Sequence, residues 1–128
     1  MQEKNNPLSP HLQIYRWQIS SLLSITHRIV GVINILAISA ICFWSLFLLL
    51  GAESYEVLNI FFNSFFGKFI AVGLCWTFSF HILNELRHLF WDMGYGFDLK
   101  ISRTTGVLAL VGSFVLTILF YLIGKNIF

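Results

Sequence analysis

Residues 29–50 read IVGVINILAISAICFWSLFLLL, a stretch without a single charged side chain. An α-helix needs roughly 20 consecutive apolar residues to cross the hydrocarbon core of a bilayer, and this stretch is long enough. Two further stretches, 65–90 and 104–124, pass the same test. The sequence therefore predicts three transmembrane helices, over about 22–50, 65–90 and 103–124.

The composition of the whole chain indicates the same class of protein. Of its 128 residues 57% are hydrophobic and only 11% are charged, which is far from the averages of soluble domains. We therefore expect an all-α integral membrane protein that forms a single anchor domain, 1–128, with a polar N-terminal segment, 1–21. The net charge of +2, without a run of Lys and Arg, argues against a nucleic-acid-binding protein.

The polar N-terminal segment does not resemble a targeting sequence. It contains Pro7 and Pro10, has no apolar core followed by a cleavage site, and is poor in arginine. We expect the chain to begin near Met1, which favours a bacterial inner membrane over the mitochondrial alternative. Cys42 and Cys75 lie within predicted spans without CxxC spacing, so we interpret them as small apolar side chains.

The distribution of basic residues predicts the orientation of the bundle. Three helices that run up and down place six of the eight basic residues on one side and two on the other. The six are Lys4, Arg16, Arg28, Arg87, Lys100 and Arg103, and the two are Lys68 and Lys125. The positive-inside rule then puts the polar N-terminal segment on the cytoplasmic or matrix side.

Two histidines, His81 and His88, lie near the end of the second predicted span. They are seven residues apart, so both imidazoles project from one face of a helix. Ionisable side chains within a membrane span are costly and usually functional. Ser24, His27 and Arg28 enter the first span from the side of the membrane toward which the second span carries His81, Arg87 and His88. We therefore expect one cluster near the cytoplasmic interface.

The depths of these side chains indicate a cofactor. His81 is six residues deeper than Arg87, about 9 Å along a helix. That depth suits an axial ligand for haem b, whose apolar ring and anionic propionates match an imidazole in the membrane and cationic groups nearer water.

The same residues also allow simpler interpretations. His81 could be a hydrogen-bonded residue of helix packing, and Arg87 and His88 could be interfacial anchors. Ser24 could donate a hydrogen bond to its own helix. Arg28 is harder to explain this way, because a guanidinium at the head of an apolar helix requires an anion or a polarised carbonyl.

Three motifs along the chain resemble a known family. They are PLSPHLQIY at 7–15, SITHR at 24–28 with Gly31, and HILNELRHL at 81–89 followed by Trp91 and Asp92. These motifs, with the order and spacing of the spans, resemble the cytochrome b membrane-anchor subunit of succinate dehydrogenase, respiratory complex II. The resemblance covers essentially the whole chain.

The resemblance implies a subunit that catalyses nothing on its own. In that family a second small three-helix anchor joins the first, and together they hold a flavoprotein and an iron-sulfur protein on the inner face of the membrane. Electrons from succinate oxidation in the tricarboxylic acid cycle pass through iron-sulfur centres to ubiquinone in the respiratory chain. The sequence agrees, since it offers no cysteine cluster for an iron-sulfur centre.

The resemblance also implies roles for particular residues. His81 matches the axial ligand of the haem b iron, whose second ligand is a histidine of the partner anchor. Ser24 and Arg28 match residues that line the quinone head-group pocket. His27 and Arg28 lie where the haem propionates are expected, and His88 matches either a further propionate contact or a residue that supports the groups in contact with haem.

The chain departs from the family pattern at three positions. Asn6 stands where Arg is common, and Val30 replaces a small hydroxyl-bearing residue. Glu85 stands where the family tends to have Gly, one helical turn from His81, and a Gly there would let the porphyrin edge approach the backbone. We expect Glu85 to turn aside, to pair with Arg87 or Arg28, or to disturb the haem.

Two other classes of function stay open. One is a self-contained cytochrome in which His27 and His81 ligate one haem, although their unequal depths argue against it. The other is a small non-redox membrane protein, for transport or assembly, in which the cluster serves only helix packing.

Overall fold

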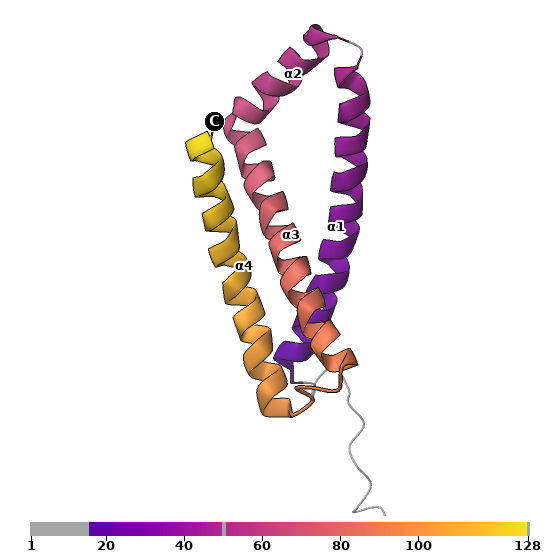
Figure 1. Ribbon diagram of the computed structural model, residues 1–128, viewed down its shortest axis with the longest axis vertical. Coiled ribbons are helices and arrows are strands. Elements are labelled where there is room, and N and C mark those ends of the chain that lie inside the picture. Colours follow the sequence, from indigo (N-terminus) through magenta and orange to yellow (C-terminus); the bar gives the residue numbers. More distant parts are fainter. Residues whose placement is uncertain (1–15, 50, 128) are drawn as a thin grey trace, which may run out of the picture.

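The computed structural model describes residues 16–49 and 51–127, and these residues form helices and short connections without a strand (Figure 1). The predicted all-helical class is confirmed. Four helices follow one another: α1 (Ile19–Leu48), α2 (Ala52–Asn63), α3 (Phe65–Asp92) and α4 (Leu99–Ile127). The motif at 7–15 and the departure at Asn6 lie outside the described residues.

Among the described residues, three helices are long and apolar enough to cross a membrane, and they are the three predicted spans. Helix α1 begins a few residues before the predicted boundary, and α3 and α4 end two to three residues after theirs. The start of α1, the end of α3 and the start of α4 gather at one end of the molecule, as in an up-down bundle (Figure 1). Which end faces the cytoplasm stays a prediction.

The sequence did not predict helix α2. Its 12 residues are too few to cross a bilayer, and it slants from the end of α1 to the start of α3 (Figure 1). The corner between α2 and α3 depends on two residues. The Ser64 hydroxyl accepts a hydrogen bond from the Gly67 backbone amide at 3.1 Å and caps α3. A Cβ atom on Gly67 would overlap the carbonyl oxygen of Phe61, so this corner requires glycine.

Small and hydroxyl-bearing residues allow α4 to pack closely on its neighbours. A Cβ atom on Gly106 would overlap the side chain of Leu23 on α1, and one on Gly112 would lie 3.1 Å from Leu83 on α3. Ser113 and Thr117 are buried, and their hydroxyls donate to carbonyl oxygens of α4 itself. Close packing through small residues is typical of membrane helices, which gain little from burying apolar surface against each other.

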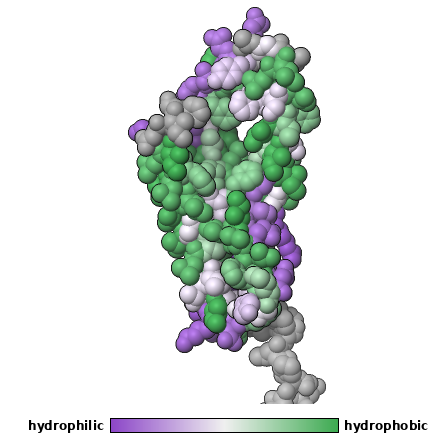
Figure 2. Space-filling view, in the orientation of Figure 1, coloured by the Kyte–Doolittle hydropathy of each residue, from purple (hydrophilic) through white to green (hydrophobic). Residues whose placement is uncertain are grey.

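The surface of the bundle is largely apolar. Figure 2 shows a broad hydrophobic belt, with hydrophilic residues at the two ends and along one edge of the half that holds the start of α1. Isoleucine, leucine and phenylalanine side chains of α1, α3 and α4 remain exposed around the molecule. Such a surface is stable in lipid and not in water.

Candidate functional site

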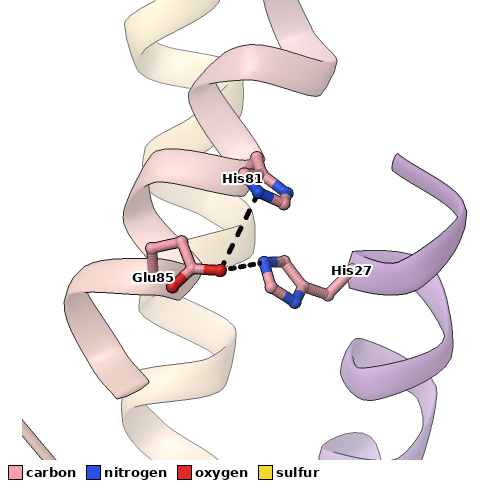
Figure 3. A group of neighbouring side chains, drawn as sticks. All are labelled: His27, His81 and Glu85. Carbon is pink, nitrogen blue, oxygen red and sulfur yellow. Dashed lines mark ion pairs between the residues drawn. The ribbon is translucent and has the colours of Figure 1, made fainter. Parts of the chain in front are cut away.

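Two histidines and one carboxylate meet between α1 and α3 (Figure 3). The His27 Nε2 atom lies 3.1 Å from the Glu85 Oε1 atom, and the His81 Nε2 atom lies 3.8 Å from that same oxygen. His81 and Glu85 are one helical turn apart on α3, so both point toward α1. The sequence left open whether Glu85 pairs with Arg87 or Arg28. In the structure its partners are the two histidines and neither of these arginines.

The imidazole rings of His81 and His88 both stack against that of His27. Its ring centroid lies 4.3 Å from that of His81 and 5.4 Å from that of His88, with interplanar angles of 20° and 21°. His88 Nδ1 lies 2.7 Å from the backbone oxygen of Asn84, an acceptor, so that nitrogen carries the proton and Nε2 is left without one in the neutral ring. The predicted convergence of the three histidines is confirmed.

Gly31 lets α1 approach His81 closely. A Cβ atom on Gly31 would lie 3.4 Å from His81 Cε1 and 3.9 Å from His81 Nδ1. These are ordinary van der Waals distances, so alanine would fit, whereas a side chain longer than alanine would meet the imidazole. The small residue at position 31 therefore leaves space for the His81 ring beside α1.

The interface beside the histidines contains polar atoms without partners. Asn84 is completely buried, yet neither atom of its amide has a hydrogen-bond partner among the described residues. The same holds for His81 Nδ1, while Asn34 donates only a long bond of 3.4 Å to the Thr77 carbonyl. Leaving such a group unsatisfied costs about 1–3 kcal/mol. These polar side chains between α1 and α3 therefore lower the stability of the isolated chain.

The short contact between His27 and Glu85 is poorly aligned. Although their atoms are 3.1 Å apart, His27 Nε2 has no hydrogen bond of acceptable geometry. The Glu85 side chain is 55% exposed, so it has room to turn toward solvent or lipid headgroups. Glu85 is therefore a movable partner of the two histidines.

The fit of this site to haem depends on His81. Its side chain is 32% exposed at the surface of the bundle, and its buried, unpartnered nitrogen is Nδ1. The ring therefore has one edge against α1 and can offer the other to a ligand from outside once Glu85 turns away. The residues present fit one axial ligand of a haem shared with another chain.

The stacked rings argue against a haem held by this chain alone. An iron with two imidazole ligands lies in a porphyrin plane that separates the two rings. His27 and His81 are instead face to face at 4.3 Å, which leaves no space for a porphyrin between them. Their nitrogens and the Glu85 oxygen lie within 4.8 Å of one another, a donor set that suits a single divalent metal better than a haem with both histidines.

Ser24 and Arg28 lie at the same end of the bundle but do not join the stack. Both side chains are exposed, and in the described part of the chain neither makes a hydrogen bond or an ion pair. Arg28 directly follows His27 on α1, so its backbone lies beside the histidine stack. The structure thus leaves a hydroxyl and a guanidinium available next to the cluster.

Arg87 lies elsewhere, and the expectation that it joins the cluster is wrong. Its side chain is buried against α4, where Nε donates to the Thr105 hydroxyl and a terminal nitrogen donates to Ser102. The reason is helical geometry. Arg87 is six residues from His81, which puts it on a different face of α3.

Comparison with known proteins identifies the family. Residues 2–120 match the family described as succinate dehydrogenase/fumarate reductase transmembrane subunit. The chain belongs to this family. The match spans most of the chain and agrees with the family that the three sequence motifs indicated.

Individual relatives agree with the family match. The succinate dehydrogenase cytochrome b556 subunit of Rickettsia felis is 42% identical over 115 residues, which cover 90% of both chains. The subunit of the same name from Paracoccus denitrificans is 34% identical over 115 residues, covering 90% of this chain and 88% of that protein. A mitochondrial inner membrane protein of Saccharomyces cerevisiae is 35% identical over 126 residues, covering 90% of this chain and 62% of that protein.

Family membership settles the cellular setting. A member of this family with three spanning helices is a multi-pass subunit of the inner membrane, and the relatives include bacterial and mitochondrial proteins. It is one subunit of a larger enzyme complex, and the name of its bacterial relatives, cytochrome b556, implies haem in those proteins.

Proposed function

We propose that this chain is the membrane-anchor subunit that helps to bind haem b and ubiquinone and passes electrons from succinate oxidation to the quinone. The observation that carries the proposal is the meeting of His27, His81 and His88 between α1 and α3, beside the exposed Ser24 and Arg28. The chain itself is non-catalytic, and its partners are the flavoprotein, the iron-sulfur subunit and a second small anchor.

In this proposal His81 would hold the haem iron for this chain, and a histidine of the second anchor would hold it from the partner's side. When bound, haem b supplies a one-electron carrier within the membrane. Gly31 leaves space for the His81 ring beside α1, and His27 packs on the face of that ring. These contacts restrict its orientation, as partners of a metal-bound histidine commonly do. Arg28, His27 and His88 supply the polar groups nearest the propionates.

Ser24 and Arg28 act on the quinone. A hydroxyl and a guanidinium can both donate hydrogen bonds to a quinone oxygen and stabilise the negative charge that develops on it during reduction. Neither side chain has another partner among the described residues that it must first release. Both are therefore free to bind a head group that lies between this chain and its partner subunits.

The test is the Arg28→Ala variant in membranes that contain the whole complex. Loss of the guanidinium should lower succinate-to-quinone turnover on the order of a hundredfold. Succinate oxidation with an artificial acceptor that draws electrons from the soluble subunits should be largely spared. The matched control is Arg103→Ala, an exposed arginine at the same end of the bundle. If the two activities of Arg28→Ala fell equally or not at all, the non-redox alternative would be favoured.

A further inference from the structure

A second concave surface lies between α3 and α4, separate from the histidine cluster. It is a groove of about 560 Å³, and its walls are mainly apolar side chains, among them Leu83, Phe90 and Leu108. None of the three residues of the histidine–carboxylate group lines it. The groove extends to the connection from α3 to α4, where Tyr95 and Gly96 line it.

Arg87 forms the charged part of this groove. The residue is only 7% exposed, and its hydrogen bonds within the described part of the chain all go to neutral groups. Nε donates to the Thr105 hydroxyl at 3.2 Å, and one terminal nitrogen donates to the carbonyl and hydroxyl oxygens of Ser102 at 2.9 Å each. The guanidinium carbon also lies 4.1 Å from the centre of the Trp91 ring.

The positive charge of Arg87 therefore has no anionic partner in the described part of the chain. The ion pairs found there join Glu85 to two histidines. Asp92 and Asp98 lie near Arg87 in the chain, but neither comes within 4.0 Å of it. A nearly buried guanidinium is costly unless its charge is compensated, which points to an anion from outside the chain.

We propose that this groove binds one anionic phospholipid, with an acyl chain between α3 and α4 and the phosphate at Arg87. Leu86, Phe90 and Leu108, which line the groove, are exposed at the surface of the bundle, so lipid is the medium that the groove meets. Nε and one terminal nitrogen of Arg87 already donate to Thr105 and Ser102, so the second terminal nitrogen is the one that can donate a charge-assisted hydrogen bond to a phosphate oxygen. Lys100 adds a second positive charge at the same end, where α4 begins. The proposal does not depend on the haem and quinone assignments.

The test compares an anionic lipid with a zwitterionic lipid that has the same acyl chains. The complex, purified with the subunits that accompany this chain and stripped of lipid in detergent, is titrated with phosphatidylglycerol or phosphatidylcholine of identical acyl chains. Native mass spectrometry counts the bound molecules. We expect a preference for phosphatidylglycerol of roughly fivefold, since one basic group near a membrane surface has about that effect.

Four variants connect this preference to the groove. Arg87→Gln should abolish it, whereas Arg87→Lys and the control Arg103→Gln should keep it. Leu86→Trp should reduce binding of both lipids, because Leu86 lines the groove and a larger ring would fill it. Equal binding of the two lipids by the unaltered complex, or an unchanged preference in Arg87→Gln, would overturn the proposal. Should Arg87→Gln fail to assemble, unchanged lipid binding by Leu86→Trp would overturn it instead.

Discussion

Glu85 places a carboxylate beside two histidines, at a position where the family resemblance leads one to expect glycine. Its oxygen is 3.1 Å from His27 and 3.8 Å from His81, so it competes with any external ligand for the His81 ring. The sequence indicated that Glu85 could interfere with a ligand of His81, because one turn of helix separates the two residues. It did not identify the partner, since the contact to His27 depends on how closely two distant segments pack.

The Glu85→Gly variant tests this competition. Removing the carboxylate should raise haem occupancy of the purified complex and raise the midpoint potential of the haem, because a nearby negative charge disfavours reduction. A partly exposed ion pair contributes about 0.2–1 kcal/mol, which corresponds to a shift of about 10–40 mV for one electron. The measurement is a redox titration followed by optical spectra. Glu85→Asp is the control that keeps the charge, and a lower potential in Glu85→Gly would refute this account.

Helices α1, α3 and α4 could be predicted from the sequence because membrane spans have a simple physical requirement. A stretch of apolar residues long enough to cross lipid must form a helix, whatever its neighbours are. Helix α2 could not be predicted this way, because it is too short to span and its position depends on contacts at both ends. The burial of Arg87 against Ser102 and Thr105 could not be predicted either, because it depends on how α3 and α4 are rotated about their axes.

The corner between α2 and α3 leads to a prediction about stability. In Gly67→Ala the new methyl group would overlap the Phe61 carbonyl, and overpacking of this kind costs about 1–3 kcal/mol. The complex should therefore lose its helical circular dichroism several degrees lower than the unaltered complex. Gly73→Ala is the matched control on the same helix, because nothing lies within 4 Å of the added atom. Equal melting temperatures for the two variants would show that the corner tolerates a side chain.

The whole molecule presents an incomplete site at its surface. His81 has one edge against α1 and is partly exposed, and Asn84 is buried without hydrogen-bond partners. A chain of this kind needs a neighbour to complete its polar interface. The polarity of the site could be predicted from the histidines and arginines of the sequence. The unpaired amide of Asn84 could not, because it depends on how α1 packs on α3.

The incomplete site predicts how the chain behaves alone. Expressed without the other subunits and purified in detergent, it should show no spectrum of a haem with two histidine ligands, because His27 and His81 stack on each other and cannot both bind one iron. Co-expression with the second anchor should restore that spectrum. A stable bis-histidine spectrum from the isolated chain would favour the self-contained cytochrome.

The role of His81 as the iron ligand is tested by the reduced-minus-oxidised optical spectrum of the assembled complex carrying His81→Ala or His27→Ala. His81→Ala should remove the b-type absorption band, because this chain then lacks its iron ligand. His27→Ala should keep the band, shifted at most, because His27 only packs on the His81 ring. A normal band in His81→Ala would contradict the assignment of His81 as the ligand. So would a band that is lost in His27→Ala but kept in His81→Ala.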